Sequence, residues 1–517
     1  MKSFSSRREF TTALIAVPAL LRAQQSGLKA RVKIDTERVI SAIDPKIYGN
    51  FIEHLGRCID GGIFEEKSKL SDENGFRRDV MKAVRDLNVT ILRWPGGNFV
   101  SNYHWRDGIG PRNDRPPRLE MAWGTVESNR FGTHEFMQYA EMLKTEPYIA
   151  VNLGTGTWTD AQQWVEYVNG KQDTAVTRER RKNGRAEPWK CTYWGLGNEM
   201  DGPWQMGHRS ADEYGKFALE AAKLMKWTDP SIKLIAAGSS HFAQGIDWIG
   251  WNRTVLEHLK RHIDYLAIHL YVGNRENNYG EFVAVSEDLA DRIKTTEGVI
   301  NAAMSGEPRN RKIYIAWDEW NVWYRARGPQ QRGRNILEER YNLEDALVVA
   351  TFLNTFINNA HIVKIANMAQ LVNVIAPIFT NPEGMFLQTI YHPLQLFANN
   401  SKGDALQLHV DSPRYETQRF GAVPYLDTSA AYDNGSLVLN VVNRHANQAI
   451  DIEFEAQDKS FAGAVEVSEV NGPDVKAEND FGSQKVTVVK RSATAQGKTL
   501  KARVAPHSYT MFKTRLA

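Results

Sequence analysis

The sequence has few cysteines, little net charge and no long apolar run, and each shortage excludes a class of protein. Two cysteines among 517 residues, Cys58 and Cys191, cannot build a disulfide scaffold or a four-thiolate zinc site, and we expect both to be buried and unpaired. Lys and Arg number 64 against 61 Asp and Glu, so the net charge of +3 does not suggest a nucleic-acid partner. No segment after the first 25 residues approaches the roughly 18 apolar residues of a membrane span. The composition, 42% hydrophobic and 24% charged, is that of a globular protein.

The first 25 residues have the features of an export signal. The pair Arg7-Arg8 precedes a mildly apolar run that ends near Leu21, and Ala23 offers a small residue for cleavage. An arginine pair in this place is typical of the twin-arginine type of bacterial signal. We therefore predict that residues 1–25 are removed and that the protein is periplasmic or extracellular. The alternative is a basic first turn without a targeting role.

Eight short apolar runs alternate with helical patterns between residues 47 and 370. They are Ile47–Glu53, Val89–Trp94, Pro147–Leu153, Cys191–Leu196, Lys233–Ala237, Asp264–Leu270, Lys312–Trp317 and His361–Ala366. Nearly continuous apolar runs are typical of parallel strands buried on both faces. Capping boxes at Thr159–Gln162 and Ser210–Glu213 predict two of the intervening helix starts. We predict an α/β fold with a closed (β/α)8 TIM barrel over residues 42–402. The alternative, an open doubly wound sheet, lacks its glycine-rich dinucleotide motif.

The apolar period changes to two after about residue 405. Seven short segments follow, separated by Gly, Asn, Asp and Pro: Leu406–Val410, Leu437–Val442, Ile450–Phe454, Ala464–Val470, Val486–Val489, Leu500–Val504 and Ser508–Phe512. This pattern predicts a C-terminal antiparallel β-sandwich over residues 403–517. The run Ala30–Ile34 has no place in the barrel, so we expect residues 26–41 to add a strand to the sandwich.

Two glutamates follow the fourth and seventh predicted strands, at the barrel face where such folds carry their active sites. They are Glu199, after Asn198, and Glu319, after Trp317-Asp318. A protonated carboxyl group paired with an ionised one is what a glycosidase requires, and a separation of about 5 Å selects the retaining route. For either glutamate alone, a salt bridge or a helix cap would be the ordinary role. Because strand neighbours point to opposite faces, we expect Glu319 rather than Asp318 to face the barrel mouth, together with Trp317.

Other strand ends supply polar and aromatic side chains of the kind that bind a hydroxyl-rich ring with apolar faces. The candidates for substrate binding are Glu53, Arg93, Asn98, Asn198, His269, Tyr271 and Gln370, with Trp123, Trp158, Trp320 and Trp323 as aromatic surfaces. The histidines lack the close spacing of a helical zinc motif, so we predict no metal.

Five motifs together indicate a family. Ile47–Arg57 (IYGNFIEHLGR), Leu92–Ser101 (LRWPGGNFVS), Gly195–Gln205 (GLGNEMDGPWQ), Asp318–Trp323 (DEWNVW) and Ala369–Asn373 (AQLVN) resemble the α-L-arabinofuranosidases of glycoside hydrolase family 51. The resemblance implies a (β/α)8 barrel with a β-sandwich and a retaining mechanism without metal or organic cofactor. It implies Glu199 as general acid/base and Glu319 as nucleophile, with Arg93 near Glu319. It places Glu53, Arg93, Asn98, Asn198, Tyr271 and Gln370 at positions that hold the sugar or orient the nucleophile. It also implies a homo-oligomer, a hexamer in many relatives.

We therefore predict an exported, retaining exo-α-L-arabinofuranosidase that acts on arabinose-containing plant polysaccharides or oligosaccharides, such as arabinoxylan and arabinan side chains. One alternative is an endo-β-1,4-glucanase or β-xylosidase on the same scaffold, and another is a non-catalytic polysaccharide-binding protein. We expect neither nucleic acid nor, after signal removal, a membrane as a partner. Two basic stretches, Arg178–Arg185 and Arg325–Arg334, are interpreted as solvated loops, with an acidic polysaccharide as the alternative partner.

Overall fold

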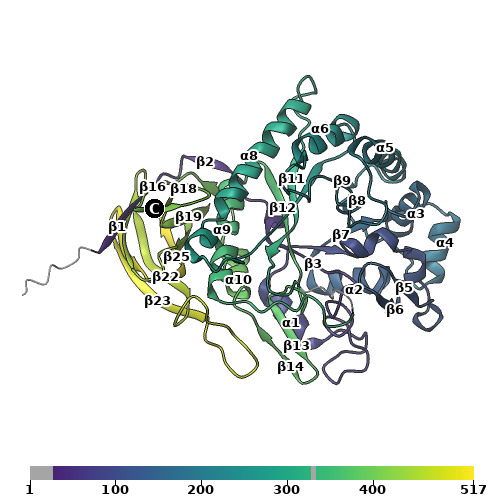
Figure 1. Cartoon of the computed structure of the whole chain (residues 1–517), viewed down its shortest axis with the longest axis horizontal. Helices are drawn as coiled ribbons and strands as arrows, with labels where there is room; N and C mark the ends of the chain where they lie inside the picture. The colour runs from purple at the N-terminus through teal and green to yellow at the C-terminus, as the bar shows by residue number, and fades with distance from the viewer. Residues whose placement is uncertain (1–26, 328–332) are drawn as a thin grey trace, which may run out of the picture.

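The computed structural model describes residues 27–327 and 333–517, which form a barrel beside a layered β domain (Figure 1). The predicted export signal, residues 1–25, and Arg332 of the second basic stretch lie outside the described residues. Within the described ranges, no helix combines the length and the apolar character needed to span a membrane. Cys58 and Cys191 are both buried and unpaired, as expected.

The barrel is a closed ring of eight parallel strands, in the order β10-β11-β12-β3-β4-β7-β8-β9. Their bounds are β3 (Gly49–Phe51), β4 (Ile91–Trp94), β7 (Glu146–Val151), β8 (Tyr193–Leu196), β9 (Lys233–Ala237), β10 (Tyr265–Val272), β11 (Tyr314–Val322) and β12 (Val363–Ala369). Each strand overlaps one of the eight predicted runs, so the predicted (β/α)8 fold is confirmed. The first strand begins later than expected because Pro45–Tyr48 forms a 3-10 turn.

Helices surround the barrel strands. They are α1 (Arg78–Leu87), α2 (Thr133–Leu143), α3 (Trp158–Asn169), α4 (Ala175–Lys182), α5 (Ala211–Thr228), α6 (Trp248–Leu259), α7 (Tyr279–Val283), α8 (Ser286–Ala303), α9 (Leu343–Asn358) and α10 (Tyr391–Asn400). Ser210 caps α5 in a box with Glu213, as predicted. The box of α3 is formed by Thr157 with Asp160, so the prediction at Thr159 was wrong by two residues. The Thr157 hydroxyl reaches the third backbone N–H of the helix, which is what a capping side chain must do.

The C-terminal strands form a sandwich whose two layers are joined by β23 (Thr487–Gln496), which pairs with a strand of each layer. One layer contains β16 (His409–Asp411), β1 (Leu28–Ile34), β21 (Ile450–Ala456) and β24 (Thr499–Val504). The other contains β22 (Phe461–Asn471), β25 (Ser508–Leu516), β20 (Ser436–Asn443), β19 (Leu426–Asp433), β15 (Asp404–Leu406) and β2 (Val39–Ala42). Apolar side chains of both layers pack into one core.

The sequence pattern did not predict β19. Its face toward α9 carries polar side chains that bond to this helix: Ser429 donates to the Asn354 side chain (2.6 Å), and Asn354 donates to Asp427 (2.6 Å). Polar contact of this kind removes the apolar alternation on which strand prediction depends.

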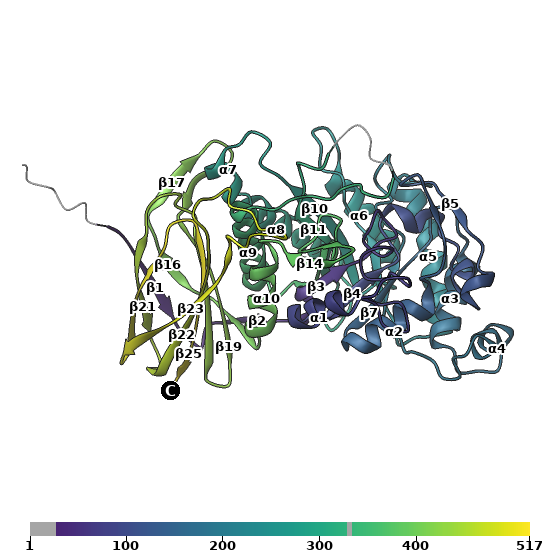
Figure 2. The same cartoon turned by 90° about the horizontal axis from the view of Figure 1, so that it is seen from below.

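Three two-stranded hairpins project from the connecting loops. They are β5 (Arg118–Glu120) with β6 (Thr125–Glu127), β13 (Ile378–Asn381) with β14 (Gly384–Leu387), and β17 (Arg414–Thr417) with β18 (Gly421–Pro424). Figure 2 shows the sandwich against α8, α9 and α10, with β17 close to α7. The buried Arg444 side chain joins the two parts, because it donates to the Val283 carbonyl (2.9 Å) and the Ser286 hydroxyl (2.7 Å).

Candidate active site

A cavity of about 750 Å³ opens at the carboxyl ends of the barrel strands. Its lining includes most of the predicted site residues: Glu53, Asn98, Trp123, Glu199, His269, Tyr271, Glu319, Trp323 and Gln370. Two more, Arg93 and Asn198, are buried and bonded to each other through a 2.6 Å contact. The structure therefore brings these residues into one region, whereas two of the four proposed aromatic surfaces lie outside it.

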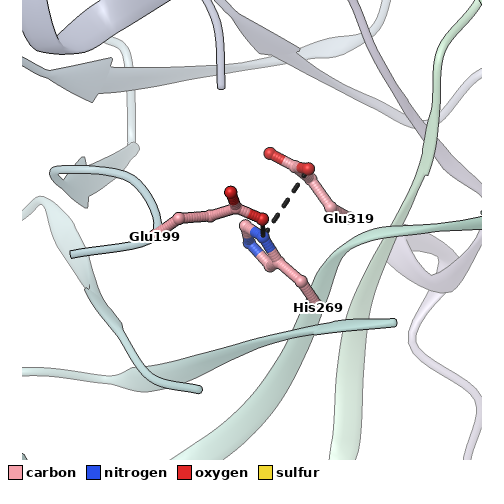
Figure 3. Close-up of side chains that lie close together, drawn as sticks. All are labelled: Glu199, His269 and Glu319. Atoms are coloured by element: carbon pink, nitrogen blue, oxygen red, sulfur yellow. Dashed lines mark hydrogen bonds and ion pairs between the residues drawn. The ribbon is translucent and has the colours of Figure 1, made fainter. Parts of the chain in front are cut away.

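Glu199 and Glu319 face each other across this cavity, with His269 between them (Figure 3). A carboxylate oxygen of each glutamate and a ring nitrogen of His269 lie within 4.8 Å of one another. The loop after β8 takes positive φ angles at Gly197 (81°) and Glu199 (44°), and the Glu199 side chain reaches the cavity from this turn. Retaining glycosidases hold their two carboxyl groups about 5–5.5 Å apart, and the nearer oxygens of this pair lie within 4.8 Å of each other.

A bulge in β11 places both Asp318 and Glu319 inside the barrel. Ala316 pairs with Ala267 and Glu319 with His269, so three steps on β11 match two on β10. Glu319 lines the cavity and Asp318 does not, but the strand-alternation argument for choosing Glu319 was wrong, because Asp318 also points into the barrel and Trp317 does not. Trp317 is fully buried and packs against α9, whereas Asp318 accepts a hydrogen bond from Tyr148 (2.7 Å). Asp318 is 2% exposed and lies beneath the cavity, so depth rather than face distinguishes it from Glu319.

Two donors orient Glu319. The Arg93 guanidinium binds one carboxylate oxygen (Nη1 to Oε1, 2.7 Å), and the Tyr271 hydroxyl donates to the other (2.8 Å). Arg93 also contacts Asp318 through Nε at 3.5 Å and the Asp318 backbone carbonyl at 3.1 Å. One buried cation therefore holds two neighbouring carboxylates in place.

Glu199 lies in a different environment. Burial and the negative charge of Glu319 raise its pKa, against the opposing hydrogen bonds from His269 (2.9 Å) and Trp204 (2.5 Å). Burial disfavours a charge on His269, but Glu319 and Asp318 outweigh it, so the pKa of His269 is raised well above its ordinary value. The positively charged form of the imidazole is therefore favoured. Its Nδ1 is bonded to Glu199, and its Nε2 is bonded to Asp318 at 3.1 Å.

Glu53 occupies another wall of the cavity. The residue is 2% exposed, and its carboxyl group accepts hydrogen bonds from the Phe99 backbone (3.0 Å), Trp123 (3.1 Å) and Gln370 (2.9 Å). Burial raises the pKa of Glu53 to about 8, so at neutral pH it is a protonated acid that can also donate to a sugar hydroxyl.

Two of the four proposed aromatic surfaces lie elsewhere. Trp123 and Trp323 line the cavity, and Trp323 packs edge-on against Tyr271 with ring centroids 5.5 Å apart. Trp158 instead packs against Phe217 on the outside of the barrel, and Trp320 is buried against α9. These tryptophans were proposed as aromatic surfaces for a sugar ring, whereas the strand bulge and the helix start decided which way Trp320 and Trp158 point.

Sequence reasoning also missed functional candidates. Trp204 donates to Glu199, and Asp318 is bonded to His269; both stand inside the quoted motifs, which was the available signal. Residues 178–182 of the first basic stretch lie in α4, where Arg178 and Arg181 pair with Asp173 and the buried Arg180 binds backbone carbonyls. This part is a helix rather than the expected loop.

The trio Glu199, His269 and Glu319 is close enough to be considered as a metal site. Both ring nitrogens of His269 are already bonded to carboxylates, Nδ1 to Glu199 (2.9 Å) and Nε2 to Asp318 (3.1 Å), so a metal ion on His269 would have to displace one of these contacts.

A closed (β/α)8 barrel that carries two facing carboxyl groups at its carboxyl face, with oxygens within 4.8 Å of each other, defines the class of the glycoside hydrolases. Comparison with known proteins gives the family. A family model described as the α-L-arabinofuranosidase C-terminal domain matches residues 318–508, and one described as the α-L-arabinofuranosidase 1 domain matches residues 83–285. The chain belongs to the α-L-arabinofuranosidases of glycoside hydrolase family 51.

Individual relatives cover nearly the whole chain. An intracellular exo-α-(1→5)-L-arabinofuranosidase of Bacillus subtilis is 40% identical over 94% of this chain and 99% of its own. The crystal structure of an α-L-arabinofuranosidase from Thermotoga maritima in complex with arabinose is 38% identical, with a TM-score of 0.87 over 94% of this chain and all of the other. A family 51 enzyme from Bifidobacterium longum is 33% identical, with a TM-score of 0.88 over the same shares.

These relatives contradict the prediction of export to the periplasm or the exterior. Three bacterial relatives at 38–40% identity are named intracellular enzymes. The prediction depended on an arginine pair and a moderately apolar run, and a basic N-terminal segment without a targeting role has the same composition. The predicted location is therefore wrong, whereas the predicted enzyme class is confirmed.

Proposed function

We propose that the protein releases terminal α-L-arabinofuranosyl residues by double displacement, with Glu199 as general acid/base and Glu319 as nucleophile. The observation that carries the proposal is the pair of facing carboxyl groups, whose oxygens lie within 4.8 Å in two contrasting environments. Family membership supports the sugar specificity.

In the first step, Glu199 protonates the glycosidic oxygen while Glu319 attacks the anomeric carbon. The bond to the leaving group breaks and an ester forms between arabinose and Glu319. The raised pKa of Glu199 keeps its proton available at neutral pH. Arg93 and Tyr271 hold both oxygens of Glu319, which aims one of them at the sugar.

In the second step, Glu199 acts as a base and takes a proton from water, which attacks the anomeric carbon and releases arabinose. His269 and Trp204 each donate to one oxygen of Glu199, so the carboxylate that forms after the first step is stabilised in position. The two steps return the anomeric configuration of the substrate.

The bound arabinofuranose would lie between Glu319 and Glu53. Glu53, Asn98, Gln370 and the amide of Asn198 are the hydroxyl-binding groups of the proposal, and Trp123 supplies an apolar face. Arg93 fixes the Asn198 side chain by binding its carbonyl oxygen, which leaves the amide NH2 as the donor.

We further propose α-(1→5)-linked arabino-oligosaccharides as the substrates. The relatives named exo-α-(1→5)-L-arabinofuranosidases support this linkage. Their names also call them intracellular, and an enzyme inside a cell meets short oligosaccharides rather than intact polymers. Arabinose-containing polysaccharides of the plant cell wall are the source of such chains.

The test follows hydrolysis of 4-nitrophenyl α-L-arabinofuranoside by the wild type, Glu319→Ala and Glu199→Ala, with Glu141→Ala, an exposed glutamate, as control. We expect Glu319→Ala to lose at least about 10³-fold in kcat. Azide should rescue Glu199→Ala and yield the α-configured arabinofuranosyl azide, because azide then attacks from the side that the leaving group vacated. A β-configured azide from Glu199→Ala, or an active Glu319→Ala, would refute the assignment.

A further inference from the structure

The loop that follows β11 brings Trp323 to the cavity, and a buried glutamate outside the cavity binds this loop. Glu339, in the segment before α9, is 0% exposed and is not part of the cavity lining. Its carboxylate accepts hydrogen bonds from three consecutive backbone N–H groups, those of Tyr324 (3.1 Å), Arg325 (2.8 Å) and Ala326 (2.5 Å). Consecutive N–H groups that converge in this way form a concavity for an anion. Glu339 therefore fixes the turn immediately after Trp323.

Arg325 balances the charge of the buried acids beside this loop. Its guanidinium lies 2.9 Å from Asp345 and 3.8 Å from Glu339, and both acids are 0% exposed. Burial removes the hydration of a carboxylate, so an acid in such a place needs hydrogen bonds and a cation. Arg325 begins the second basic stretch, and the structure gives it this internal role rather than a purely solvated one.

The turn that Glu339 binds also fixes the ring of Trp323. The indole N–H of Trp323 donates to the carbonyl of Ala326 (3.3 Å), and the N–H of Ala326 is one of the three that Glu339 accepts. The indole packs edge-on against Tyr271, with ring centroids 5.5 Å apart. The Tyr271 hydroxyl donates to Glu319 (2.8 Å). A continuous line of contacts therefore runs from Glu339 through Trp323 to the proposed nucleophile.

Glu339 is itself fixed to the barrel. Its backbone carbonyl accepts a hydrogen bond from the side chain of Gln388 (2.9 Å), which is 0% exposed. The same side chain accepts from the N–H of Tyr341 (3.0 Å), and the Tyr341 hydroxyl donates to the carbonyl of Val322 (2.8 Å), the last residue of β11. The segment that carries Glu339 is thus a rigid support for the loop.

We propose that Glu339 is a positioning residue for the reaction: it fixes the loop after β11, so that Trp323 keeps Tyr271 in place to orient Glu319. The inference rests on the proposed function. Without the carboxylate, three buried or partly buried N–H groups lose their acceptor, and the loop is free to take other conformations. The Trp323 ring then supports Tyr271 less firmly, and the nucleophile is aimed less well at the anomeric carbon.

The experiment measures kcat/KM for 4-nitrophenyl α-L-arabinofuranoside, because this quantity includes the step in which Glu319 attacks. The full chain is compared with Glu339→Gln, Trp323→Ala and the double variant. We expect Glu339→Gln to lose about tenfold, Trp323→Ala at least as much, and the double variant no more than about twofold beyond Trp323→Ala. Glu338→Gln is the matched control and should keep the wild-type value, because its neighbouring carboxylate forms an ordinary side-chain pair with Arg57 (2.7 Å).

Two further measurements separate positioning from a general loss of structure. Hydrogen exchange of the amides of residues 324–326 should become at least about tenfold faster in Glu339→Gln and stay unchanged in Glu338→Gln. Formate should restore part of the activity of Glu339→Ala, because the empty concavity can bind a small carboxylate, and should not restore Trp323→Ala. A thermal melt of each variant shows that it is folded. Should Glu339→Gln be unfolded, Arg325→Met replaces it in the same comparison, because it removes the cation and leaves the three N–H groups.

A loss below about twofold for Glu339→Gln would overturn the inference. So would equal losses in the wild-type and Trp323→Ala backgrounds, since Glu339 would then act independently of Trp323, or an equal loss in Glu338→Gln. Unchanged exchange at residues 324–326, or no rescue by formate, would overturn it as well. All these results leave the proposed function intact, whereas a wild type that did not cleave the aryl glycoside would refute the proposed function itself.

Discussion

Replacing Arg93 by methionine tests whether one guanidinium holds the buried charges of the site together. Arg93 is 1% exposed and contacts Glu319 at 2.7 Å, Asp318 at 3.5 Å and Asn198 at 2.6 Å. Methionine has a similar length without charge, so the variant removes these contacts with little loss of volume. Asp318 and Glu319 would then have His269 as their nearest positively charged neighbour.

The expected cost is large because the carboxylates cannot be hydrated. At an effective dielectric constant of about 20, the contacts at 2.7 and 3.5 Å correspond to about 6 and 5 kcal/mol of attraction. Desolvation of the three charged groups offsets much of this, and removing one partner of a buried pair costs about 3–5 kcal/mol. We expect Arg93→Met to lower the free energy of unfolding by that amount at pH 7.

The assay is urea unfolding followed by tryptophan fluorescence for the wild type, Arg93→Met, Asp318→Asn and the double variant. Asp318→Asn should cost less in the Arg93→Met background, with a coupling of at least about 1 kcal/mol. Arg118→Met, which breaks an exposed pair with Asp107, is the control and should lose far less. A loss below about 1 kcal/mol for Arg93→Met, or additive single effects, would refute the reasoning.

Three further predictions concern the cavity walls. Burial raises the pKa of Glu53 from 4.5 to about 8, so the folded protein keeps a proton that the unfolded chain releases. The free energy of unfolding of the wild type should therefore fall by up to about 5 kcal/mol between pH 4.5 and 8, at about 1.4 kcal/mol per pH unit. Glu53→Gln has no titrating group at this position and should lose this part of the pH dependence. Gly97→Ala would place a methyl group 3.1 Å from Glu53 Oε2 and 3.4 Å from Glu319 Oε1, so KM for the aryl glycoside should rise about tenfold or more. Trp204→Phe removes a donor that favours the ionised form of Glu199, so its pKa rises further and the alkaline limb of the kcat/KM profile moves to higher pH.

Each of these has a matched control. Urea midpoints at pH 5 and 8 that fall equally for Glu53→Gln and the wild type would contradict the first. Gly298→Ala, where an added methyl group meets open space, should leave KM unchanged while Gly97→Ala raises it. Trp227→Phe removes an exposed indole far from Glu199 and should leave the pH profile in place, whereas a shift of Trp204→Phe to lower pH would contradict the third.

Local patterns in the sequence were sufficient for the barrel. A strand buried on both faces needs an apolar residue at nearly every position, so each of the eight strands left a run that could be located within a few residues. A helix start depends on one capping side chain. The sequence pattern located the cap of α5 at Ser210 but placed the cap of α3 at Thr159, two residues after the actual cap, Thr157. The sequence pattern did not predict strand β19 because its contact with α9 is polar.

Some features of the active site likewise follow from the sequence alone, and others follow only from the tertiary structure. The sequence alone determined the fold class, the family and the identity of the two facing glutamates as candidates, because long motifs and strand-end positions are local features. Only the tertiary structure decided that a bulge turns Asp318 inward, that Trp320 faces α9, and that burial raises the pKa of Glu53. Only the tertiary structure brings Gln418 of the sandwich into the cavity with Glu281. Bulges, burial and contacts between distant segments depend on what packs against a residue, and a chain pattern records only its neighbours along the sequence.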